Sequence, residues 1–201
     1  VGGKAGLVHL HIGNGQRMLD PILRIVEETE IPIGQFLPTH LNRELPLFQQ
    51  AIRFAKMGGN IDFTAKGPER NPPLTTEKAL RIAIEEGVAI EQITLSSDSN
   101  GSMPIFDEKG RMIRVGVGDI QNLYLEWKSL VEQGLPIETI LKMVTSNPAQ
   151  RAGISHHKGS IAEGKDADLL ILNSDLKIEY VMAKGQMMVQ GAEILVKGIF
   201  E

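Results

Sequence analysis

The chain has 201 residues, of which 42% are hydrophobic and 23% are charged, and 21 basic against 25 acidic residues give a formal net charge of −4. These values are typical of a globular protein, and the acidic balance excludes the broad basic surface of a nucleic-acid binder. The absence of cysteine excludes disulfides, thiolate metal ligands and a cysteine nucleophile. No uncharged apolar stretch of about 18 residues and no secretion signal is visible, so we expect a cytoplasmic protein without a membrane partner.

Four short β-like runs, each followed by a helical pattern, predict four βα units. The runs span residues 7–12, 35–40, 60–65 and 92–97. Such alternation is typical of a parallel sheet covered by helices. Four units match half of a (β/α)₈ barrel, which needs eight strands. A four-stranded flavodoxin-like sheet is an alternative that the spacing leaves open.

The helical segments are recognised by their apolar faces. The first two faces consist of Met18, Ile22, Ile25 and Val26, and of Leu47, Ala51, Phe54 and Ala55. We expect Thr75 to begin a third helix and Gly87 to end it. After the fourth strand, residues 101–118 are predicted as a polar excursion and residues 123–134 as a helix.

The chain changes character after Gly153. Short apolar runs at residues 168–172, 178–183, 186–189 and 194–196 are separated by Gly, Asn or Lys, which predicts a small antiparallel β unit. We therefore divide the chain into an α/β part, residues 1–153, and a β part, residues 154–201.

Three potential metal ligands lie at the ends of predicted strands. His11 lies near the end of the first, His40 ends the second and Asp98 ends the fourth. In parallel α/β folds, reactive residues collect at the carboxyl ends of the strands. Imidazole and carboxylate groups suit Zn²⁺, which lowers the pKa of a bound water. The alternatives are that each histidine is a core residue and that Asp98 only begins a turn.

Other polar segments carry weaker signals. His9 lies two residues before His11, on the same face of the strand, as in a metal-binding pair. The neighbours His156 and His157 are predicted to face different directions in a solvated linker. The loop 66–73 would border the crevice above the strands as a rim, a lid or a simple connector.

Several segments resemble the metal-dependent amidohydrolases. The run Thr-Ser-Asn-Pro-Ala at 145–149, together with residues 158–170, is similar to the region where the barrel of that superfamily is followed by a small β-sandwich. Residues 37–43, 58–62, 94–102 and 196–201 resemble, more narrowly, isoaspartyl (β-aspartyl) dipeptidases. The resemblance covers only the second half of that family's sequence. It implies barrel strands 5–8 over residues 1–153, followed by part of the β-sandwich over residues 154–201.

The resemblance also implies roles for single residues. His11 and His40 would be the fifth- and sixth-strand ligands that together hold one of two zinc ions. Asp98, on the eighth strand, would bind the second zinc ion and accept the proton of the attacking hydroxide. Arg43 and Ser102 match residues that bind the substrate. The family's paired histidines belong to the first barrel strand, so we interpret His9 as structural.

The implied function is that of a zinc metallo-dipeptidase, of which this sequence would be the C-terminal half. The complete enzyme would hydrolyse the side-chain-linked amide of β-aspartyl dipeptides and form a homo-oligomer. The remaining zinc ligands would belong to an N-terminal half that this sequence does not contain, so the lone chain is expected to be inactive. The alternatives are another amidohydrolase, such as a cyclic-amide hydrolase, and a non-catalytic half-barrel that serves as an assembly module.

Overall fold

Four short strands form the centre of the molecule. The computed structural model describes residues 6–65, 74–107 and 111–198. The strands are β1 (Val8–His11), β2 (Phe36–Thr39), β3 (Ile61–Thr64) and β4 (Ile93–Ser96). β1 pairs with β2 and β3 pairs with β4, both in parallel. The amide N–H of Leu41 donates to the carbonyl of Asp62 (3.3 Å), so the end of β2 lies against β3.

These strands lie within the four runs expected from the sequence, and the α/β class with four βα units is confirmed. Within the described residues the four strands form two parallel pairs and no closed barrel. The half-barrel therefore stays a prediction. The buried residues of β2 and β3 show that both strands are covered on both faces.

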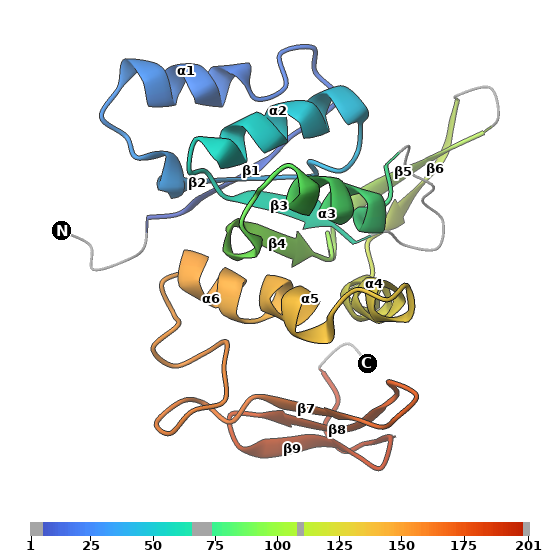
Figure 1. Ribbon diagram of the computed structural model, residues 1–201. Helices are drawn as coiled ribbons and strands as arrows, with labels where there is room; N and C mark the ends of the chain where they lie inside the picture. Colours follow the sequence, from blue (N-terminus) through green and yellow to red (C-terminus); the bar gives the residue numbers. More distant parts are fainter. Residues whose placement is uncertain (1–5, 66–73, 108–110, 199–201) are drawn as a thin grey trace.

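Helices cover the strands on two sides (Figure 1). In this view α3 (Thr76–Glu85) overlaps β3, whereas α1 (Asp20–Glu28) and α2 (Leu45–Lys56) lie above the strands. Below them lie α4 (Gln121–Glu132), α5 (Ile137–Val144) and α6 (Ser146–Arg151). Two single 3₁₀ turns, η1 (Ile33–Gln35) and η2 (Ile90–Gln92), precede β2 and β4. The sequence did not predict α5 and α6, because eight and six residues are too short to display a clear helical period.

The local signals at α3 and α2 are confirmed. The Thr75 side chain accepts a hydrogen bond from the amide of Lys78, and Gly87 follows the helix with a φ of +82°. The predicted face of α2 is buried throughout. The predicted face of α1 is partly wrong, because Ile25 is 39% exposed whereas Leu23 is buried.

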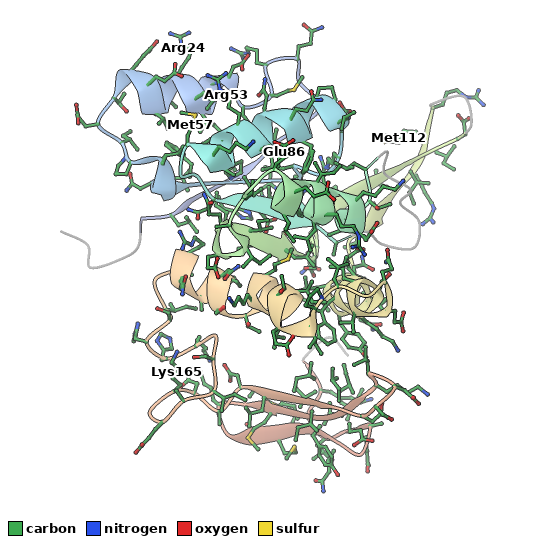
Figure 2. All side chains as sticks on the ribbon, viewed as in Figure 1. Arg24, Arg53, Met57, Glu86, Met112 and Lys165 are labelled. Atoms are coloured by element: carbon green, nitrogen blue, oxygen red, sulfur yellow. The ribbon has the colours of Figure 1, made fainter. Side chains whose placement is uncertain are left out.

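Within the range 101–118, the described residues form two antiparallel strands instead of the expected polar excursion. β5 (Ser102–Phe106) and β6 (Met112–Val117) are antiparallel and project beyond the ends of the central strands (Figure 1). Apolar side chains of β6 are exposed, among them Met112, which lies on the arm away from the helices (Figure 2). The strand signal was missed because glycines and charges interrupt the apolar residues.

The small antiparallel β unit is confirmed as one sheet with the order β10-β9-β8-β7. Its strands are β7 (Leu169–Leu172), β8 (Ile178–Ala183), β9 (Gln186–Gln190) and β10 (Glu193–Ile194). A second sheet of a sandwich is not seen among the described residues, so that part of the expectation stays untested. The hydroxyl of Tyr124 on α4 donates to the carbonyl of Leu176, which ties the sheet to the helices.

The linker before the small sheet is held by an ion-pair cluster. The Lys158 ammonium contacts Asp166 (2.7 Å) and also Asp168. These hydrogen bonds raise the pKa of Lys158 and lower the pKa of both carboxyl groups.

In the part of the chain that is described, no helix is long and apolar enough to cross a membrane.

Candidate metal centre and its surroundings

Three side chains meet where the central strands end. His11 is the last residue of β1, His40 directly follows β2, and Asp98 lies two residues after β4. His40 has a φ of 70° and Asp98 a φ of 54°, so both adopt the left-handed backbone conformation that is rare outside glycine. Such conformations cost roughly 1–3 kcal/mol each and persist only where the surroundings enforce them. Strain of this kind is concentrated at functional sites.

The ligand atoms of these three residues face one another. His11 Nδ1 lies 2.9 Å from His40 Nε2, and His40 Nε2 lies 3.8 Å from Asp98 Oδ1. Each of the three residues offers one ligand atom, and these atoms lie within 4.8 Å of one another. Among the described residues, no other group of three metal-binding side chains is arranged in this way. His40 and Asp98 are well buried, whereas His11 is exposed. The group therefore opens toward solvent on the β1 side.

The donor set and its spacing fit a zinc ion. Nitrogen and oxygen ligands about 2.0–2.2 Å from a tetrahedral zinc lie roughly 3.3–3.5 Å from one another. The two imidazole nitrogens lie 2.9 Å apart, slightly closer than that range, and Asp98 Oδ1 lies 3.8 Å from His40 Nε2, near enough to serve the same ion or a neighbouring one. The two imidazoles alone would leave coordination positions of a zinc ion open for water and further ligands, as a catalytic site requires.

Arg43 joins the group. Its guanidinium lies 3.8 Å from Asp98 Oδ2, and its side chain is 32% exposed. The amide N–H of Arg43 donates to the carbonyl of His40 (3.2 Å), so both residues belong to the same turn between β2 and α2. The site thus combines metal-binding groups with a fixed, partly accessible cation.

Comparison with known proteins identifies the family. The sequence profile of the amidohydrolase family matches residues 73–188, which is more than half of the chain. This chain belongs to the amidohydrolase family. Its fold is also similar to that of the β-aspartyl dipeptidase of Fervidobacterium islandicum AW-1, solved in complex with β-Asp-Leu dipeptide, with a TM-score of 0.87 and 37% identity. That match covers 98% of this chain and 50% of the dipeptidase chain.

Two further relatives are more distant. An adenine deaminase of Rubrobacter xylanophilus is 34% identical over 68 residues, which cover 32% of this chain and 11% of that protein. An amidohydrolase of Thermotoga maritima has the same fold with a TM-score of 0.60 at 20% identity, over 92% of this chain and 43% of its own. The chain therefore spans about half the length of the solved dipeptidase and a smaller part of the curated relative.

Of the five predicted site residues of this amidohydrolase, the structure brings together His11, His40, Asp98 and Arg43. Ser102 lies four residues beyond Asp98, exposed at the start of β5. Backbone hydrogen bonds fasten the hairpin to the loop of Asp98: the N–H of Asn100 donates to the carbonyl of Gly118, and the N–H of Gly118 donates to that of Gly101 (both 3.0 Å).

Asp98 is enclosed so closely that neighbouring positions tolerate only glycine. A Cβ atom on Gly118 would lie 2.1 Å from the Asp98 carbonyl oxygen, and one on Gly101 would lie 2.7 Å from its Oδ1. These glycines therefore allow the base of the hairpin to lie against Asp98. The sequence contains both glycines, but their role depends on a contact that only the fold reveals.

A buried carboxylate that the sequence did not single out lies beneath the site. Asp62 on β3 accepts hydrogen bonds from the hydroxyls of Thr39, Thr94 and Ser96, each 2.5 Å long. Burial raises the pKa of Asp62, whereas the three hydroxyl donors oppose that rise. The network links β2 and β4, the strands that lead to His40 and Asp98. The available signal was an aspartate alternating with threonine in an otherwise apolar strand.

A second missed residue touches a proposed ligand directly. The Thr64 hydroxyl lies 2.7 Å from His40 Nδ1, the ring nitrogen that faces away from His11. Asn42 holds the same threonine through two hydrogen bonds to its backbone. No pattern in the sequence distinguishes this threonine from an ordinary strand residue.

The remaining histidines differ in their surroundings. The exposed ring of His9 lies 5.1 Å from that of His11, on the same face of β1. The expectation that His156 and His157 face different directions is wrong: the linker forms a turn at these residues, and their ring centroids are 4.3 Å apart. The loop 66–73, considered above as a rim or lid, lies outside the described residues.

Proposed function

We propose that this chain supplies the second half of the active site of a zinc-dependent dipeptidase that hydrolyses β-aspartyl dipeptides. The observation that carries the proposal is the meeting of His11, His40, Asp98 and Arg43 at the ends of the central strands. A metal-binding set alone would fit many hydrolases. The adjacent guanidinium adds a means of binding a substrate carboxylate, which a β-aspartyl dipeptide carries beside its scissile amide.

In this proposal His11 and His40 hold one zinc ion, and Asp98 is a ligand of a second. Zinc would supply a water molecule of lowered pKa as the nucleophile. The Asp98 carboxylate would accept the proton of that water and deliver it to the leaving amine. Its burial and its two glycine neighbours keep it in place for this transfer.

Arg43 and Ser102 are proposed to bind the substrate. A guanidinium has five N–H donors, so Arg43 can contact Asp98 and still present donors to a substrate carboxylate. The exposed Ser102 hydroxyl would add a hydrogen bond when the dipeptide is present.

The narrower aspects of the proposal are supported by the similarity to the solved dipeptidase. This chain matches half of that protein, and the described strands form no closed barrel. We accordingly propose that residues 1–153 are strands 5–8 of a (β/α)₈ barrel and that residues 154–201 belong to a β-sandwich. The other zinc ligands would lie in a complementary N-terminal half. A cytoplasmic homo-oligomer is the assembly proposed for the complete enzyme.

The test is hydrolysis by the protein at its natural length. We expect cleavage of β-Asp-Leu, loss of activity with a metal chelator and recovery with zinc, while α-Asp-Leu is cleaved far more slowly. Hydrolysis of a hydantoin without cleavage of β-Asp-Leu would favour a cyclic-amide hydrolase instead. A protein that binds no zinc and cleaves neither compound would favour the non-catalytic assembly module.

A further inference from the structure

We infer that Thr64 is the residue that orients the His40 imidazole, by accepting a hydrogen bond from its Nδ1–H so that the Nε2 lone pair points into the metal site. The inference rests on the proposed function in one respect, that His40 binds the metal. It assigns a role to β3, the one central strand from which no ligand or substrate-binding residue comes.

The geometry leaves this ring one arrangement that can bind a metal. His40 Nε2 lies 2.9 Å from His11 Nδ1, and His40 Nδ1 lies 2.7 Å from Thr64 Oγ1 on the opposite side. A neutral imidazole has one N–H donor and one lone pair. If Nε2 binds a metal, the proton must be on Nδ1, and the Thr64 oxygen is the acceptor that holds it there.

The backbone alone does not orient His40. β2 ends at Thr39, and the φ of 70° takes His40 out of the strand conformation. Because His40 lies beyond the last residue of β2, the direction of its ring is set by its side-chain contacts. His40 is only 3% exposed, so a polar ring nitrogen in this position needs a protein partner rather than bulk water.

Thr64 is itself held by the segment that it orients. The Asn42 Oδ1 atom accepts from the Thr64 N–H (2.9 Å), and Asn42 Nδ2 donates to the Thr64 carbonyl (3.0 Å). This pair of bonds imitates the pairing of a neighbouring strand. Because Asn42 lies between His40 and Arg43 in the chain, the turn that carries the imidazole and the guanidinium is fixed to the end of β3.

The test compares zinc affinity among variants of the natural-length protein, measured by competition with a chromophoric chelator. Removing the partner of a metal-bound histidine typically costs 10–100-fold in metal affinity. We expect Thr64→Val to weaken zinc binding by about that factor and Thr64→Ser to retain it within about threefold. Thr64→Ala provides a second variant without the hydroxyl should the valine prevent folding.

The matched control is Thr94→Val, which removes a buried hydroxyl from the adjacent strand. Thr94 donates to Asp62 rather than to His40, so we expect lower thermal stability and an unchanged zinc dissociation constant. If wild type and Thr64→Val bind zinc equally well, the inference is wrong while the proposed function stands. If the wild type itself binds no zinc, the proposed function and the inference both fail.

Discussion

His40 and Asp98 lie side by side, but their replacement is expected to have different effects on zinc content and turnover. His40 faces His11 at 2.9 Å and completes an imidazole pair, whereas Asp98 approaches that pair with a single carboxylate oxygen. We predict that His40→Ala loses most of its zinc and its activity. Asp98→Ala should keep the zinc held by the histidines but lose turnover by about 10²–10⁴-fold or more, as expected for loss of a general base. Zinc content and kcat measure the difference, and normal turnover in Asp98→Ala would disprove the assigned role.

Arg43 is predicted to contribute through the shape of its guanidinium as well as its charge. Arg43→Lys keeps the charge but removes the planar pair of donors that fits a carboxylate. We expect kcat/KM for β-Asp-Leu to fall by about 10–100-fold, mainly through a higher KM, since a bidentate charge-assisted contact is stronger than a single one.

The control for this change is Arg53→Lys on α2 (Figure 2). The guanidinium of Arg53 lies 3.9 Å from the carboxylate of Glu27, and both side chains are largely exposed. Its replacement should leave steady-state kinetics unchanged. Equal kinetics for Arg43→Lys and the control would show that Arg43 does not bind the substrate.

The raised pKa of Asp62 predicts that the stability of the protein depends on pH. Its folded pKa lies above the ordinary value of 3.8 because of burial. Between these two values the folded protein holds a proton that the unfolded chain has lost, so stability falls as the pH rises through this window. The free energy of unfolding of the wild type minus that of Asp62→Asn should therefore decrease from about pH 4 upward. Urea unfolding of both proteins measures this difference, and a constant difference would contradict the raised pKa.

At the residue scale, the site residues that could be predicted are those that lie at the ends of predicted strands. His11, His40 and Asp98 follow apolar β runs, and strand ends are where ligands collect in α/β folds. Asp62, Thr64 and the two glycines escaped notice because their roles arise from contacts across strands. The hydrogen-bond partners of a polar residue inside a strand are known only when the fold shows which residues of the neighbouring strand lie beside it.

At the element scale, the β5–β6 hairpin determines where Asp98 lies. Gly118, directly after β6, approaches the Asp98 carbonyl so closely that an added Cβ would lie 2.1 Å from it. Gly118→Ala must shift backbone rather than a flexible side chain, so we predict a loss of about 1–3 kcal/mol in stability and strongly reduced turnover.

Gly34→Ala is the matched control for the hairpin. Gly34 lies in η1, where an added Cβ would meet no atom within 4 Å. Thermal unfolding and kcat of this variant should resemble the wild type. If Gly118→Ala behaved in the same way, the hairpin could not be positioning Asp98.

The elements themselves were predictable to different degrees. Strands β1–β4 and helices α1–α4 have apolar patterns long enough to show their period, and β7–β9 are bounded by turn residues. Helices α5 and α6 escaped prediction because they are too short, and the hairpin escaped because glycines and charges interrupt the apolar residues of β6, which are exposed. A strand is recognised in a sequence by the alternation that a buried apolar face produces, and an exposed hairpin lacks such a face.

At the scale of the whole molecule, the chain matches half of the solved dipeptidase. Its proposed metal ligand His11 is exposed, on the side where β1 has no further strand among the described residues. A complementary half-barrel would cover that side. We therefore predict that the protein isolated from its source has a denatured mass near twice 22 kDa. A mass near 22 kDa would instead require a separate partner chain for catalysis.

The most direct test of the central claim is anomalous X-ray diffraction at the zinc absorption edge from crystals of the natural-length protein. The account predicts a zinc peak about 2.0–2.2 Å from His11 Nδ1 and His40 Nε2, with a second zinc ion bound by Asp98. Absence of zinc between the two imidazoles, or zinc bound only at His156 and His157, would contradict it.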